Sequence, residues 1–320
     1  MKRLRVAVVG VGYLGRFHAE KYRARADVEL VAVVDLDARR AAEVAEAVGS
    51  EALGDYAALR GRVDCASVAV PTQQHHVVAA ELLEAGIDVL VEKPLASSIE
   101  EGKALVELAA RAGRVLQVGH LERFNPALLA LEGVITQPRF IECHRLAPFS
   151  ERGTDVDVVL DVMIHDLDLI LSMTGSALRS VEAVGVPVLT PTADIANARL
   201  RFANGCIANV IASRVSMKKE RKLRIFQPDA YVAIDFGERK VRIIGRRPGA
   251  DGQPELHLEE REVPEADALE TEIDAFLRAV RTREAPPVSG WDGLRALEVA
   301  HVIRESLEAE VRAAQAAAES

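Results

Sequence analysis

Cysteine is scarce in this chain of 320 residues. The three cysteines, Cys65, Cys143 and Cys206, lie far apart and have no paired spacing. This distribution argues against a disulfide framework and against a zinc site. We therefore expect no bound metal, and we interpret all three as small buried apolar residues.

Long apolar runs and an excess of basic residues are also missing. No segment approaches the roughly 20 apolar residues of a membrane span. The short apolar run 6–9, which follows a basic amino terminus, indicates a first β-strand rather than a signal peptide. The formal net charge of -9 disfavours contact with nucleic-acid phosphates. We expect a cytoplasmic protein with neither a membrane nor a nucleic-acid partner.

Strand-like and helix-like segments alternate through the first part of the chain. Apolar runs at 4–9, 30–34, 63–70, 87–91 and 115–118 are separated by helical patterns. This alternation predicts a doubly wound parallel sheet of the Rossmann type, which belongs to the α/β class. Because 320 residues exceed one ordinary core, we expect a first domain at 1–120 and a second at 121–320.

A glycine-rich segment follows the first predicted strand. The pattern G-x-G-x-x-G stands between that strand and a helical pattern, which is the context that gives it meaning. Its glycines permit a tight turn, a close approach of a pyrophosphate and close helix packing, and the helix amino terminus favours the phosphate charge. We predict that a dinucleotide contacts Gly10, Gly12, Tyr13, Leu14 and Gly15.

An acidic residue ends the second predicted strand. Asp35 lies about 20 residues beyond the glycines, as the dinucleotide fingerprint requires. A carboxylate there accepts hydrogen bonds from the ribose hydroxyls and repels a ribose phosphate. The sequence therefore favours NAD over NADP, although Arg39 and Arg40 lie close enough to reach a phosphate.

The second domain is predicted to be an open, mostly antiparallel sheet with helices on one face, an α+β arrangement. Segments between 139 and 244 alternate apolar with polar residues, as strands with one wet face do. A helical pattern in this region carries Asp161, His165 and Asp168, whose spacing places them on one helix face. Asp161 and His165 are candidate catalytic and substrate-binding residues.

Three motifs together resemble the Gfo/Idh/MocA dehydrogenases. They are the glycine segment, the Pro71-Thr72 turn with His75 following, and Glu92-Lys93-Pro94. The resemblance implies that Lys93 is catalytic, that its bond to proline is commonly cis, and that the cofactor site includes Pro71, Thr72, His75, Glu92 and Lys93. It also implies a homodimer or homotetramer. The segment 161–168 is similar to the family pattern Asp-x-Gly-x-His-x-x-Asp, with Met163 in place of the glycine.

Alcohol oxidation with NAD needs a base for the hydroxyl proton. As free side chains, histidine (reference pKa about 6.5) is a ready base at neutral pH and lysine (about 10.4) is not. Lys93 competes only if burial and the positive nicotinamide favour its neutral form. We expect Lys93 and His165 to flank the reacting hydroxyl, with Asp161 orienting one of them. The sequence leaves open which of the two is the base.

The substrate is expected to be a sugar or a UDP-sugar. The segments 119–126 and 163–168 look most like family members that oxidise C3 of UDP-N-acetylglucosamine to a 3-keto sugar for lipid A assembly. Predicted substrate contacts are His120, Arg123, Asn125, Asp161 and His165, and a basic run could meet the diphosphate, comprising Arg214, Lys218, Lys219 and Arg221.

The sequence is also compatible with two other functional assignments. The first is a family member that oxidises a free sugar or inositol, or an NAD-dependent glycosidase that uses transient oxidation at C3. The second is a regulator that binds NAD without catalysis. That reading expects Lys93 or His165 to be missing, and both are present.

Overall fold

A computed structural model describes residues 3–150, 156–248 and 253–318. The chain divides into two compact units. The first comprises Met1–Phe124 and Asp267–Leu297, and the second comprises Asn125–Ala266 and Glu298–Ser320. The segment Asp267–Leu297 belongs to the first unit although it comes late in the sequence.

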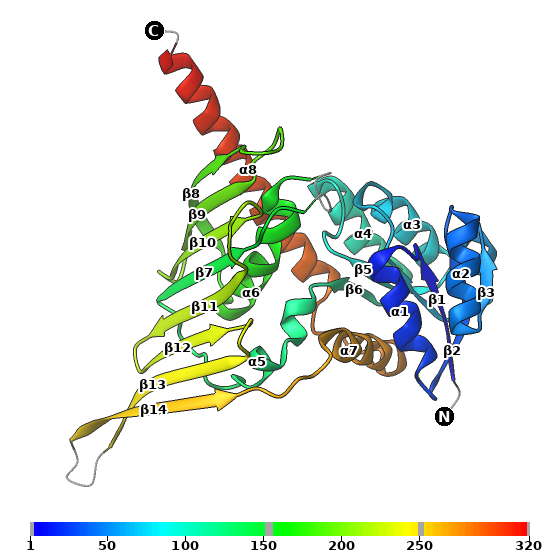
Figure 1. Ribbon diagram of the computed structural model, residues 1–320. Helices are drawn as coiled ribbons and strands as arrows, with labels where there is room; N and C mark the ends of the chain where they lie inside the picture. Colours follow the sequence, from blue (N-terminus) through cyan, green and yellow to red (C-terminus); the bar gives the residue numbers. More distant parts are fainter. Residues whose placement is uncertain (1–2, 151–155, 249–252, 319–320) are drawn as a thin grey trace. The chain divides into compact units, whose positions relative to one another are not determined.

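Six parallel strands form the sheet of the first unit (Figure 1). Their order is β3-β2-β1-β4-β5-β6, so the direction of strand addition reverses between β1 and β4. Open α/β sheets bind ligands outside the carboxyl ends of the strands at this reversal. The strands are β1 (Leu4–Val9), β2 (Val28–Val34), β3 (Glu51–Leu53), β4 (Cys65–Val68), β5 (Asp88–Glu92) and β6 (Leu116–Gly119).

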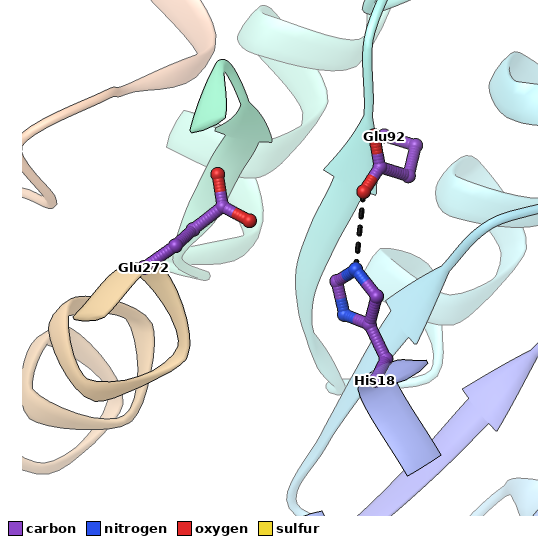
Figure 2. Close-up of side chains that lie close together, drawn as sticks. All are labelled: His18, Glu92 and Glu272. Carbon is purple, nitrogen blue, oxygen red and sulfur yellow. Dashed lines mark hydrogen bonds and ion pairs between the residues drawn. The ribbon is translucent and has the colours of Figure 1, made fainter. Parts of the chain in front are cut away.

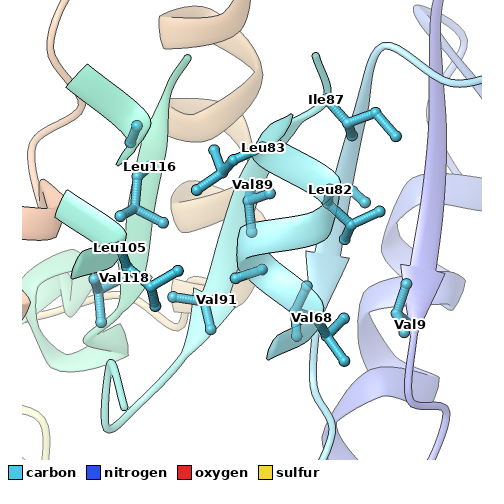
Figure 3. Packing of buried hydrophobic residues seen from close by; sticks show 14 of the residues in the cluster. Val9, Val68, Leu82, Leu83, Ile87, Val89, Val91, Leu105, Leu116 and Val118 are labelled. Carbon is cyan, nitrogen blue, oxygen red and sulfur yellow. The ribbon is translucent and has the colours of Figure 1, made fainter. Parts of the chain in front are cut away.

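Helices cover both faces of this sheet, as predicted for a Rossmann unit. Val6 and Val8 of β1 belong to one apolar cluster, whereas Ala7 and Val9 belong to the other, because successive side chains of a strand point to opposite faces. Figure 3 shows the cluster between the strands and α3 and α4. The helices are α1 (Tyr13–Arg23), α2 (Ala38–Val48), α3 (Thr72–Glu84), α4 (Ile99–Ala112) and α7 (Ala268–Thr282), with short turns η1 (Tyr56–Leu59) and η2 (Leu121–Phe124).

Helix α7 joins the first unit although it comes late in the sequence. Its apolar side chains Ile273, Phe276 and Leu277 are buried in the same cluster as Val6 and Val8 of β1. Just after the helix, the Arg283 guanidinium donates to both carboxylate oxygens of buried Asp88, at 2.6 and 3.1 Å. Apolar burial and this ion pair explain why the segment packs with the Rossmann sheet.

Eight strands form the sheet of the second unit, in the order β14-β13-β12-β11-β7-β10-β9-β8. Only β7 and β10 pair in parallel among these neighbours, so the predicted mostly antiparallel sheet is confirmed. The strands are β7 (Phe140–Leu146), β8 (Leu178–Val186), β9 (Ile195–Phe202), β10 (Ile207–Ser213), β11 (Glu220–Gln227), β12 (Ala230–Asp235), β13 (Lys240–Pro248) and β14 (Pro254–Glu262). The remaining elements are α5 (Pro126–Leu129), the π-helical turn η3 (Val159–Met163), α6 (Ile164–Thr174) and α8 (Gly290–Ala318).

Strand β14 was not predicted from the sequence. It lies at the edge of the sheet, and its apolar residues Leu256 and Leu258 are 77% and 60% exposed among charged neighbours. An edge strand of this kind has no buried face to mark it in the sequence, and its charges protect the edge from pairing with other chains. Within the described residues, no helix is long and apolar enough to cross a membrane.

Replacing Phe276 tests the packing of α7 on the sheet. Phe276 is fully buried, so Phe276→Ala should lower the free energy of unfolding by about 3–5 kcal/mol. Leu258→Ala, on the exposed edge strand, is the control and should change it by less than about 0.5 kcal/mol. Urea unfolding followed by circular dichroism measures both. Equal effects of the two substitutions would contradict the packing of α7 described above.

Candidate functional site

The glycine turn between β1 and α1 is so tightly packed that a side chain at two of its positions would clash with the backbone. Gly10 has a φ of +82°, and a Cβ there would lie 2.7 Å from the backbone of Ala69. A Cβ on Gly15 would lie 1.8 Å from the carbonyl oxygen of Gly10. Gly12 caps the amino terminus of α1 without a side-chain hydrogen bond. The turn therefore brings backbone amides close to any phosphate placed at this helix end.

A cavity of about 520 Å³ opens beside this turn. It lies where β1, β2 and β4 end, which is the reversal point of the sheet. The predicted residues Gly10, Gly12, Asp35 and Pro71 line it, together with Leu36, Asp37, Arg40, Tyr56 and Gln74. The exposed Tyr13 and Leu14 begin α1 next to Gly12. These glycines, the cavity and an acid at its wall fit a dinucleotide.

Asp35 is held in a fixed position at the wall of the cavity. Its Oδ2 accepts a hydrogen bond from the Val11 amide at 3.0 Å, and its Oδ1 accepts one from the Asp37 amide at 2.9 Å. Arg40 lies 3.4 Å from Asp35 and 3.2 Å from Asp37, whereas Arg39 pairs with Glu43 outside the cavity. The Arg40 guanidinium is therefore paired with the carboxylates of both Asp35 and Asp37.

His75 connects two loops of the first unit. Thr72 begins α3, and one turn later the buried ring of His75 has Nδ1 2.7 Å from the carbonyl oxygen of Pro94 and Nε2 2.9 Å from that of Val70. Burial lowers the pKa of His75, against the opposite effect of the two carbonyl contacts. His75 therefore lies against the backbone that carries Lys93, while Gln74 beside it lines the cavity.

Lys93 follows β5 directly and is half-buried. Its peptide bond to Pro94 is cis. The Lys93 amide donates to Glu92 Oε2 at 3.3 Å, and the Glu92 carboxylate lies over Gly119 of β6, where a Cβ would come within 3.0 Å of it. The absence of a side chain at Gly119 thus leaves room for the glutamate that precedes the lysine.

A chain of buried polar side chains reaches Glu92 from α1. Hydrogen-bond distances are 2.8 Å from Tyr22 to Ser67, 3.1 Å from Ser67 to His18 Nδ1, and 3.0 Å from His18 Nε2 to Glu92 Oε1. Glu272 of α7 points toward His18 and Glu92 (Figure 2). A ring nitrogen of His18 and one carboxylate oxygen of each glutamate lie within 4.8 Å of one another. These side-chain types also occur in metal sites, but the His18 Nε2 atom is engaged with Glu92 here.

His18 and Glu272 were not predicted as site residues. Each lies on the apolar face of its helix, between residues of the core. Leu269, Ile273 and Phe276 mark the buried face of α7. Glu272 lies on that face, and a charged residue at such a position could have indicated a functional role. For His18 the partners come from strands distant in the sequence, so no local pattern revealed them.

In the second unit, Asp161 lies in η3 and His165 in the first turn of α6. Both are half-buried, whereas Asp168 is buried. A π-helical turn is wider than an α-helical one and is frequent at functional sites. The α-helical spacing that the prediction assumed begins only at Ile164. Met163, which replaces the family's glycine, is fully buried.

Asp157 before η3 and the ion pair between Arg145 and Asp166 of α6 hold this helical segment. The Asp157 carboxylate accepts from the amides of Val159 and Leu160 at 3.0 and 3.1 Å, which caps η3. On α6, Arg145 of β7 donates to both oxygens of Asp166 at 3.0 and 2.8 Å, and both side chains are buried. The backbone that carries Asp161 and His165 is therefore held on both sides.

The predicted substrate residues have varied surroundings. His120 is buried after β6, Arg123 lies 3.5 Å from Asp292, and the Asn125 side chain accepts from the Ala127 amide at 3.0 Å, which caps α5. Arg214 was expected among basic residues that meet a diphosphate, but it is buried and donates to Asp194 at 2.9 Å. Its guanidinium thus holds the structure together, while the basic side chains that follow it, Lys218, Lys219 and Arg221, are exposed.

Two family models match this chain. Residues 4–120 match the oxidoreductase family with an NAD-binding Rossmann fold, and residues 128–233 match the GFO/IDH/MocA C-terminal domain. The matched segments include the glycine turn, Lys93 and the 161–168 segment. Together they cover more than half of the chain.

Curated relatives align over nearly the whole chain. A UDP-N-acetylglucosamine 3-dehydrogenase of Acidithiobacillus ferrooxidans is 40% identical over 311 residues, which are 97% of this chain and 99% of the relative. An inositol 2-dehydrogenase of Saccharopolyspora erythraea is 27% identical over 330 residues, which are 95% of this chain and 93% of the relative.

Solved structures agree with these relatives. The Acidithiobacillus ferrooxidans enzyme superposes with a TM-score of 0.90 over 97% of this chain and 99% of that one. A scyllo-inositol dehydrogenase of Lactobacillus casei, solved with NAD(H) and scyllo-inositol, superposes with a TM-score of 0.80 over 97% and 98% at 19% identity, which shows the fold alone. The chain belongs to the Gfo/Idh/MocA family of oxidoreductases.

Proposed function

We propose that this oxidoreductase uses NAD to oxidise C3 of UDP-N-acetylglucosamine to the 3-keto sugar. The observation that carries the proposal is the full-length similarity to a dehydrogenase of that name, at 40% identity. Inositol dehydrogenases are also related, but the full-length one compared above is only 27% identical. Within the proposal, the keto sugar is a lipid A precursor, and the enzyme works in the cytoplasm as a homodimer or homotetramer.

The first unit would hold the cofactor in the cavity beside the glycine turn. In this proposal Gly10, Gly12 and Gly15 allow the pyrophosphate to approach, and Asp35 accepts hydrogen bonds from the adenosine ribose. Tyr13, Leu14, Pro71, Thr72 and the Glu92-Lys93 segment complete the cofactor contacts, and His75 supports the last of these through Pro94. When bound, NAD accepts the hydride of the carbinol carbon.

Three polar side chains are proposed to carry out the proton chemistry. We propose that Lys93 and His165 contact the reacting hydroxyl, that one of them removes its proton, and that Asp161 orients the base. His120, Arg123 and Asn125 are proposed sugar-nucleotide contacts.

The substrate assignment is tested by NAD reduction, followed at the nicotinamide absorbance. Turnover is expected with UDP-N-acetylglucosamine and not with free glucose, inositol or UDP-glucuronate. Lys93→Ala should lower kcat by about 10²-fold or more, whereas Lys103→Ala, on an exposed position of α4, should leave it unchanged. Turnover confined to inositol or a free sugar would reject the nucleotide sugar. NADH binding without turnover on any substrate would favour the regulator.

The identity of the base is tested by the pH dependence of kcat. If His165 removes the proton, His165→Asn should lower kcat by about 10²-fold and abolish the fall in activity on the acidic side of the profile. His144→Asn, on β7 beside Glu142 and Glu220, is the matched control and should keep that fall. An unchanged acidic side in the His165 variant would assign the proton to Lys93 instead.

Cofactor preference is tested by Asp35→Asn. The amide keeps an acceptor for the Val11 N–H but removes the charge, so the Kd for NADH should rise about tenfold and the preference over NADPH should shrink. Glu43→Gln is the control, because Glu43 pairs with Arg39 outside the cavity. Fluorescence titration with both reduced cofactors measures the ratio, and tighter binding of NADPH by the unmodified protein would reject the NAD assignment.

A further inference from the structure

A carboxylic acid lies buried in the apolar face of α7. Glu272 is 0% exposed, and neither of its carboxylate oxygens has a hydrogen-bond partner among the described residues. The side-chain nitrogen of Gln117 on β6 donates to the backbone oxygen of Glu272 at 3.1 Å. An ionised carboxylate in such surroundings is strongly disfavoured, so Glu272 requires either a proton or an opposite charge.

Among the described residues, no hydrogen-bonding cation contacts the Glu272 carboxylate. Its polar neighbours include His18 and Tyr22 of α1 and Glu92 of β5. His75 of α3 influences Glu92 from further away. A ring nitrogen of His18 and a carboxylate oxygen of Glu92 lie within 4.8 Å of a Glu272 carboxylate oxygen (Figure 2). A second carboxyl group thus lies where a positive charge would be needed.

One direction of the hydrogen-bond chain leaves Glu92 as the ionised carboxyl group. Tyr22 is fully buried, and burial raises the pKa of its hydroxyl, so it remains a donor. If Tyr22 donates to Ser67 and Ser67 donates to His18 Nδ1, then His18 Nε2 carries its proton toward Glu92. Every hydrogen then has an acceptor. Although burial alone would raise the pKa of Glu92, the bond from His18 lowers it, so Glu92 is the anion.

The pKa of Glu272 is shifted in the opposite direction to that of Glu92. Burial, reinforced by the negative charge of Glu92, raises the pKa of Glu272 well above its ordinary value. Two neighbouring carboxyl groups in a buried site commonly share one proton, because both cannot ionise together. Gln117 Oε1 is a second buried atom without a hydrogen-bond partner among the described residues.

We propose that Glu272 is a protonated acid that donates its proton toward ionised Glu92 through one bridging water, and so positions Lys93. Glu92 Oε1 then contacts His18 while Oε2 accepts the Lys93 amide. A proton from Glu272 fixes the carboxylate in this orientation, and the backbone before Lys93 with it. Glu272 is a positioning residue in this account, which rests on the proposed role of Lys93.

The first test measures stability against pH for Glu272→Gln. A group whose folded pKa is raised contributes stability that is fully present below its unfolded pKa and is lost as the pH rises. The Tm of the unmodified protein minus that of the variant should therefore fall steadily between about pH 5 and pH 8. Glu270→Gln, at an exposed position of the same helix, is the control and should show no such trend. A difference that instead grows with pH would mean an ionised Glu272 and would overturn the proposal.

The second test separates positioning from packing. Gln can still donate a hydrogen bond toward Glu92 through the bridging water, whereas Met fills a similar volume without a donor. Glu272→Met should lower kcat about tenfold with little change in KM, and Glu272→Gln should restore it to within about threefold. Equal kcat values for the two variants would overturn the positioning role.

Two further results keep this inference separate from the proposed function. If no sugar is turned over, the pH dependence of stability still tests the proton on Glu272, because it needs neither substrate nor cofactor. Elemental analysis of the purified protein tests a metal at the same three side chains. About one divalent ion per chain, lost in Glu272→Gln, would overturn the protonated state of Glu272, and its absence would support it.

Discussion

Parallel pairing of six strands is the constraint on which the site of the first unit depends. Such pairing places the carboxyl ends of β1, β2, β4 and β5 at one edge of the sheet. The glycine turn, Asp35, Pro71 and Lys93 each follow one of these strands. Residues that are far apart in the sequence therefore gather at one edge, and the reversal between β1 and β4 opens the cavity there.

Burial of charge beneath this edge constrains the glutamate that precedes Lys93. The Glu92 carboxyl group lies 3.0 Å from His18 Nε2, and Gly119 leaves space for it. Glu272, brought in by a helix from the end of the chain, adds a second acid to the same buried site. Packing of α7 and the chemistry proposed for Lys93 are therefore linked through one carboxylate.

Local patterns were sufficient to predict the Rossmann unit, its glycine turn and the placement of Asp35 and Lys93 at strand ends. Strand β14 was missed because its exposed leucines stand among charges, and the return of α7 was missed because its partners are distant in the sequence. Arg214 was misassigned, since a basic run does not reveal a buried acid such as Asp194. Tertiary contacts, rather than periodicity, decide each of these cases.

The most direct test of the account follows the hydrogen on C3 of UDP-N-acetylglucosamine. The substrate would be prepared with deuterium at that carbon, and the reduced cofactor would be analysed by mass spectrometry after turnover. The account predicts that the deuterium appears in the reduced cofactor and does not exchange with water. Unlabelled reduced cofactor, formed while the sugar is consumed, would contradict oxidation at C3.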